Sequence, residues 1–185
     1  MKITGLTSLL FVVFAAAGCE DPFEFDWDAR PDTARIYSLA LPETNLPSAF
    51  SFFLRIPIVV ESPGSTGQWD IALDNEGGGL VLLPPRALGI NSRARIAPLP
   101  GVSFSDVLEA PPDTAAYVSD RGVPLTAGTV YVVQTGEQVG AFGSRCVYFA
   151  KLQPVEIDVA GGAFSFLFDG NPICNDPRLV PPDDD

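Results

Sequence analysis

Glycine and proline recur so often along this chain that long regular elements are not expected. The 185 residues include 17 glycines and 18 prolines, close to a fifth of the total. Both residue types disfavour helix interiors, proline because it lacks the backbone N–H and glycine because it loses the most conformational freedom. The segments between them are short and rich in aromatic and β-branched residues. We therefore expect an all-β fold, an antiparallel sandwich or a curled sheet, with at most one or two short helices.

Eight segments have the composition or the alternation of strands, and most are bounded by turn sequences. Gly161 and Gly162 stand between the last two, which predicts a hairpin. A helix is suggested only at 104–109, where Ser103 or Ser105 could cap it and Pro111 would end it. The expected strands are 35–41, 51–60, 68–73, 80–83, 129–135, 146–153, 155–159 and 163–168.

The beginning of the sequence has the pattern of a bacterial lipoprotein signal peptide. Lys2 is followed by an apolar run over residues 6–17, which is too short to cross a bilayer, and the run ends in the sequence AAGC. Small residues directly before a cysteine form a lipobox, and Cys19 would become the lipid-bearing first residue of the mature chain. We predict a signal peptide at 1–18; the alternative is an ordinary secretory signal that happens to contain a cysteine.

The three cysteines then divide into one lipid carrier and one pair. With Cys19 acylated, Cys146 and Cys174 remain, an even number in an oxidising compartment. A disulfide would close a loop of about 29 residues and remove roughly 3.5 kcal/mol of unfolded-state entropy. The alternative is a pair of free or metal-binding thiols, which neither a histidine nor a CxxC spacing supports.

Negative charge is concentrated at the two ends of the mature chain. The net charge is −12, but residues 33–182 hold 14 acidic and nine basic residues and so carry only −5. We divide the mature chain into an acidic tether at 19–34, a single β-rich domain at 35–180 and an acidic tail at 181–185. This charge gives no basic face for nucleic acid, so nucleic acid is not an expected partner.

The chain contains no histidine, which excludes a Ser-His-Asp triad, a Cys-His dyad and any histidine-based metal site. Carboxylates are the remaining candidates for catalysis. Glu156 and Asp158 lie two residues apart on an expected strand and would share a face. With Asp70 they are the candidates for a carboxylate-dependent envelope hydrolase, although a solvated strand face explains them more simply. We expect no enzyme, no metal and no resident cofactor.

Aromatic residues within the expected strands are candidates for an apolar ligand pocket. Trp69, Tyr131 and Tyr148 are the three that we single out. The alternative is that each belongs to the hydrophobic core, because aromatic side chains dominate burial in β folds.

Four short motifs occur in order along the chain: YSL at 37–39, WDIAL at 69–73 before a glycine-rich turn, VYVVQT at 130–135 and YFAKL at 148–152. This set resembles the HmuY-like family of bacterial haem-binding envelope lipoproteins, whose members carry a similar WDIAF segment, a YVVRT strand and a YAK(I/L) strand. The resemblance implies an all-β fold attached to the outer membrane, displayed at the surface or in the periplasm.

The haem ligands of that family have no counterpart here. Family members that bind haem use paired axial histidines, or methionine in some relatives. This chain has no histidine, and its single methionine is Met1, within the expected signal peptide. A tyrosine such as Tyr131 or Tyr148 would be the remaining ligand for haem iron.

These observations give one leading function and two alternatives. The leading hypothesis is a lipid-anchored, non-catalytic binding or interaction module of the Gram-negative envelope on an HmuY-like β scaffold. Its partners would be the membrane, through the lipid, and an unknown protein or small apolar ligand. The first alternative is the capture of haem or another planar apolar ligand, and the second is the carboxylate-dependent hydrolase.

The anchor can be tested directly. We expect Cys19→Ser to release the protein from the membrane fraction, because the lipid is its expected attachment. Fractionation of cells expressing either form, with immunodetection of the protein, measures this. Continued sedimentation of the variant with membranes would contradict the lipidation of Cys19.

Overall fold

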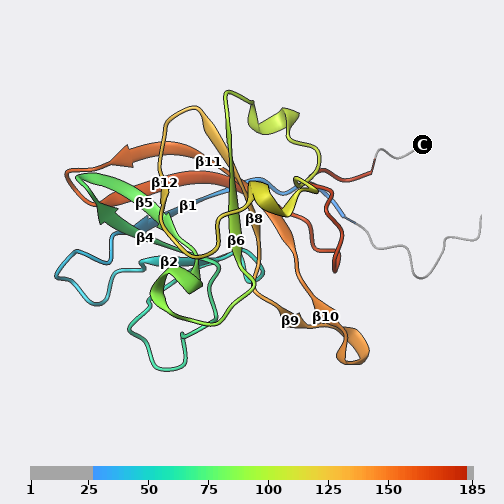
Figure 1. Ribbon diagram of the computed structural model, residues 1–185, viewed down its shortest axis with the longest axis horizontal. Coiled ribbons are helices and arrows are strands. Elements are labelled where there is room, and N and C mark those ends of the chain that lie inside the picture. The colour runs from blue at the N-terminus through green and yellow to red at the C-terminus, as the bar shows by residue number, and fades with distance from the viewer. Residues whose placement is uncertain (1–26, 183–185) are drawn as a thin grey trace, which may run out of the picture.

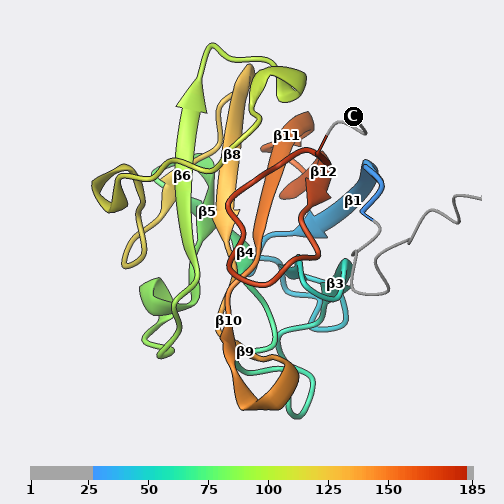
Figure 2. The same ribbon diagram turned by 90° about the vertical axis from the view of Figure 1, so that its right-hand side faces the viewer.

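The computed structural model describes residues 27–182 (Figures 1 and 2). Over these residues the regular structure consists of 12 short strands and four 3-10 helices of three or four residues. The expected all-β class and antiparallel sandwich are confirmed. Cys19, the expected signal peptide and the first half of the expected acidic tether lie outside the described residues. The 3-10 helices are η1 (Pro85–Leu88), η2 (Phe104–Asp106), η3 (Thr114–Ala116) and η4 (Ala141–Gly143).

Ten of the strands form two five-stranded antiparallel sheets. The first has the order β1 (Asp32–Tyr37), β12 (Ala163–Gly170), β11 (Phe149–Asp158), β8 (Thr129–Gln134) and β6 (Arg95–Pro100). The second has the order β3 (Ile56–Ile58), β2 (Ala49–Ser51), β4 (Ile71–Glu76), β5 (Gly79–Leu83) and β7 (Val123–Pro124).

The remaining two strands, β9 (Gln138–Val139) and β10 (Arg145–Cys146), form a separate ribbon. It projects from one end of the sandwich, at the bottom of Figure 2. Its tip carries Phe142, which is fully exposed.

The main core lies between the sheets and follows from the period of two in strands. Phe164, Phe166 and Phe168 alternate along β12 and are all buried. Phe50 of the opposite sheet meets two of them edge-on, with ring centroids 5.2 Å from Phe166 and 4.8 Å from Phe168. Ile71 and Leu73 of β4 complete this layer. Aromatic pairs of this kind stabilise by about 0.5–1.5 kcal/mol beyond their buried area.

Both outer sheet faces are also covered, which is why the central strands are apolar on both sides. Val130 and Val132 of β8 pack outward beneath the segment that contains η2 and beneath Leu179. Lys151 points to the same side, where its Nζ donates to the carbonyls of Phe104 and Val107 at 2.9 Å each. Burial lowers the pKa of this lysine.

Three expected strands differ in the structure. The strand expected at 51–60 is not continuous: β2 ends at Ser51, Arg55 adopts a φ of +58° in the turn that follows, and β3 begins at Ile56. Pro57 lies in β3, which is an edge strand, where the missing N–H costs no ladder bond. Residues 149–158 form one strand with a bulge between Pro154 and Glu156 rather than two strands. The helix expected at 104–109 is only the 3-10 turn η2.

Cys146 and Cys174 form the expected disulfide. It joins β10 to the segment that follows β12, so the base of the ribbon is fixed to the body. Disulfides persist in oxidising compartments, which indicates an extracytoplasmic protein. Among the described helices, none has the length and apolar character needed to cross a bilayer.

We expect the folded protein to show no reactive thiol at Cys146 or Cys174, as measured by maleimide labelling without reductant. The double variant Cys146→Ala/Cys174→Ala should lose about 3 kcal/mol of unfolding free energy in urea, because the bridge spans 28 residues. Stoichiometric labelling of the native protein would contradict the bond.

Candidate functional site

An aromatic cavity of about 350 Å³ lies where the N-terminal segment crosses the end of the sandwich. Four further segments form its walls: the turn after β2, the residue directly after β8, the start of β11, and the end of β12 with the chain that follows it. We call this hollow the aromatic cavity. Its lining residues are Trp27, Asp28, Arg30, Phe52, Phe53, Arg55, Thr135, Tyr148, Phe149, Ala150, Asp169, Gly170, Asn171 and Pro172.

Flat side chains dominate the walls of the cavity. The rings of Phe53 and Tyr148 lie 4.9 Å apart between centroids and are inclined by 33°. Trp27 is buried, and its Nε1 has no hydrogen-bond partner among the described residues. A buried donor without a partner costs about 1–3 kcal/mol. The cavity therefore offers flat stacking surfaces.

The charges of the cavity are paired with one another. Asp169 is buried and receives N–H groups from Arg30 at 3.1 Å and from Gly170 at 2.8 Å. The Arg55 guanidinium lies 3.4 Å from the Asp169 carboxylate and 4.7 Å from the Phe168 ring centre. It also donates to the carbonyl of Arg30. With Asp28 near Arg30, the two cations and two anions balance, so the cavity has no net formal charge.

Asp70 fixes the turn that forms one wall of this cavity. Its two carboxylate oxygens accept the N–H groups of Phe52 and Gly136, both at 2.8 Å. Burial raises the pKa of Asp70 to about 6, although the N–H donors of Gly136 and Phe52 act to lower it. Gly136 lies close to this pair of residues: an added Cβ would be 3.3 Å from Ser92 Oγ, which would have to shift slightly, and 3.7 Å from Asp70 Oδ1.

Of the three aromatic residues singled out from the sequence, only Tyr148 lines the aromatic cavity. Trp69 is buried on the outer face of the second sheet, among Ala72, Val81 and Leu83. Tyr131 lies in the central core, where its hydroxyl donates to Pro124 O and accepts from Thr126 N, both at 2.8 Å. For Trp69 and Tyr131 the core alternative describes their environment.

The structure does not bring the three candidate carboxylates together. Glu156 is exposed and pairs with Arg35 at 2.8 Å. Asp158 accepts the N–H of Gly161 in the last hairpin. Asp70 is buried with both oxygens occupied by backbone donors. This arrangement gives no support to the hydrolase alternative, which needs two carboxylates at one cleft.

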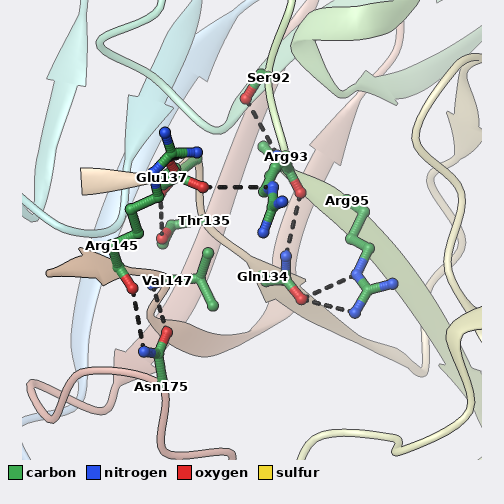
Figure 3. Close-up of polar contacts among 11 residues, drawn as sticks. Ser92, Arg93, Arg95, Gln134, Thr135, Glu137, Arg145, Val147 and Asn175 are labelled. Atoms are coloured by element: carbon green, nitrogen blue, oxygen red, sulfur yellow. Dashed lines mark hydrogen bonds and ion pairs between the residues drawn. The ribbon is translucent and has the colours of Figure 1, made fainter. Parts of the chain in front are cut away.

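A second hollow, of about 380 Å³, lies beside β6, which is an edge strand of the first sheet. Figure 3 shows its polar contacts. We call it the arginine pocket; its lining residues are Arg86, Ser92, Arg93, Arg95, Ser119, Gln134 and Val147. Among these described lining residues none is acidic.

Sequence reasoning missed most residues of both hollows. Trp27 and Phe53 lie in segments that read as tether and strand, and their meeting depends on the turn at Arg55. The signal available for the arginine pocket was the spacing of Arg93 and Arg95, which lie just before and at the first residue of β6. Arg86 and Gln134 join them only through the fold.

Comparison with family models, with curated proteins and with solved structures gives no match for this chain. The arguments about function therefore rest on the geometry of the two hollows.

Asp70 gives a pH-dependent prediction. Because its folded pKa is raised from 3.8 to about 6, its contribution to stability is complete below pH 3.8 and is lost as the pH rises through 6. The difference in unfolding free energy between the wild type and Asp70→Asn should fall by up to about 3 kcal/mol over that window. Urea denaturation at several pH values measures it, with Glu61→Gln, an exposed carboxylate, as the control. A difference that does not change with pH would contradict the shift.

Proposed function

We propose that the protein is a non-catalytic binding module of the Gram-negative envelope, anchored through Cys19, whose aromatic cavity takes a planar apolar ligand. The observation that carries this proposal is the aromatic cavity itself. Five of its lining residues are aromatic, and its charged groups are paired with each other. Cavities with apolar walls and a few polar groups are the usual form of small-molecule sites.

The chemistry of the walls selects for a flat and uncharged ligand. Phe53 and Tyr148 face one another closely enough to stack, and a ring placed against them would gain the same kind of contact. A charged ligand would have to compete with the Arg55–Asp169 pair.

The position of the cavity supports the envelope role. Trp27 lies eight residues after Cys19, and a segment of that length spans at most roughly 30 Å. A lipid on Cys19 would therefore hold the cavity close to the membrane surface, where apolar molecules are concentrated. The disulfide, which indicates an extracytoplasmic protein, agrees with this placement.

The haem alternative is less well supported by the residues present. No histidine exists in the chain, and the lining of the cavity includes no methionine. Tyr148 is the single tyrosine that lines it, so the paired ligands of the HmuY-like family are absent. We therefore propose an organic planar ligand held by stacking, without a bond to iron.

The neutral dye N-phenyl-1-naphthylamine is a suitable probe, because its fluorescence increases in apolar surroundings. We expect saturable binding that quenches Trp27, and a loss of affinity of about tenfold in Phe53→Ala, equivalent to one aromatic contact. Phe142→Ala is the matched control, since it removes an exposed phenylalanine from the tip of the ribbon.

Absence of saturable dye binding, or equal losses in both variants, would contradict the proposal. Haemin is the second titrant. A Soret shift that disappears in Tyr148→Phe, while dye binding persists, would favour the haem alternative over the proposed one.

A further inference from the structure

The arginine pocket is a concentration of positive charge on an otherwise acidic protein. Three of the chain's 11 basic residues line it, and none of its described lining residues is acidic. Arg145 lies nearby and shares Glu137 with Arg93, each at 3.3 Å. The four arginines and one glutamate leave a local formal charge of +3 on a chain of −12.

Two of the three lining arginines have no carboxylate partner among the described residues. Arg86 is exposed on η1, and no described acidic group forms an ion pair with it. Arg95 is half-buried and bonds instead to a neutral amide, with Nε at 2.9 Å and Nη2 at 2.7 Å from Gln134 Oε1. A guanidinium has five N–H donors, so Arg95 keeps three for a ligand.

Arg95 is held in place before any ligand arrives. Its guanidinium lies 4.3 Å from the centre of the Tyr117 ring, and Gln134 is fixed in turn by donating to the carbonyl of Arg93 at 3.2 Å (Figure 3). Burial raises the pKa of Tyr117 to about 12, so its phenol stays neutral at physiological pH and does not neutralise the charge of Arg95. A pre-positioned arginine loses less entropy on binding.

Two hydroxyl groups complete the donor set. Ser92 Oγ accepts the N–H of Ala94 at 3.1 Å, which leaves its own O–H free to donate. Val118 forms an isolated β-bridge with Ile96 of β6. This bridge places the next residue, Ser119, in the lining of the arginine pocket. The lining is therefore rich in hydrogen-bond donors, which suits a ligand that carries several acceptor oxygens.

We propose that the arginine pocket binds a phosphate group, either as free phosphate or as the phosphate of a lipid headgroup. One bidentate arginine satisfies the two oxygens of a carboxylate, whereas a phosphate has enough oxygens and charge for three guanidinium groups and two hydroxyls. The strongly acidic remainder of the chain repels anions elsewhere. This site is separate from the aromatic cavity and does not depend on its ligand.

Calorimetric titration of inorganic phosphate into the mature chain carrying Cys19→Ser, at constant ionic strength, tests the proposal. Arg86→Gln should weaken phosphate binding by roughly 10- to 100-fold, as expected for the loss of a charge-assisted bond. Because Arg86 is exposed, we expect the Arg86→Gln variant to fold normally. Arg35→Gln is the matched control, because Arg35 is an exposed arginine on β1, at the other edge of the same sheet.

Sedimentation with phosphatidylcholine vesicles, with and without phosphatidic acid, distinguishes the two sources of phosphate. Binding to free phosphate alone supports a soluble ligand, and binding only to phosphatidic acid vesicles supports a headgroup. In either case Arg86→Gln should weaken the binding and Arg35→Gln should not. No binding in both arms, or equal weakening by Arg86→Gln and Arg35→Gln, would overturn the proposal.

Discussion

The two hydrogen bonds accepted by the buried carboxylate of Asp70 hold together chain segments that contribute to both hollows. One oxygen holds the N–H of Phe52, at the start of the turn that carries Phe53 and Arg55 into the aromatic cavity. The other accepts the N–H of Gly136, which lies between Thr135 of the aromatic cavity and Glu137, the ion-pair partner of Arg93. Burial of a charged group is costly unless it is hydrogen-bonded, and here both oxygens are occupied. A single side chain thus links a turn of one sheet to the end of a strand in the other.

The two hollows differ in charge although they belong to one small acidic domain. In the aromatic cavity each arginine lies near a carboxylate, so stacking determines what can bind. In the arginine pocket, Arg95 is paired with a neutral amide and keeps its full charge available. The difference in charge between the two hollows therefore depends on whether the fold places a carboxylate or a neutral amide next to each arginine. It explains how a chain with net charge −12 can present one neutral and one positive site.

The regular strands could be predicted because burial on alternate positions leaves a visible pattern. Phe164, Phe166 and Phe168 show it directly, and the removal of Cys19 from the cysteine count predicted the pair at Cys146 and Cys174. The turn at Arg55 could not be predicted, since nothing local requires a positive φ in an arginine within an apolar run. Consequently the turn that interrupts the strand expected at 51–60 was missed, and with it one wall of the aromatic cavity. The sequence does not distinguish Trp69 and Tyr131, which lie in the core, from Tyr148, which lines the cavity, because both environments favour aromatic residues.

Three properties of this protein follow from its amino-acid sequence: the all-β class, the pairing of the last two cysteines and the exclusion of histidine chemistry. Composition and spacing are sufficient for these, since they depend on local period and on residue counts. The tertiary structure alone decided which aromatic side chains reach a cavity and which arginines share a pocket. Those groupings join residues that are far apart in the chain, such as Trp27 with Asp169 and Arg86 with Gln134. They arise from strand register and from one buried carboxylate, which no local pattern encodes.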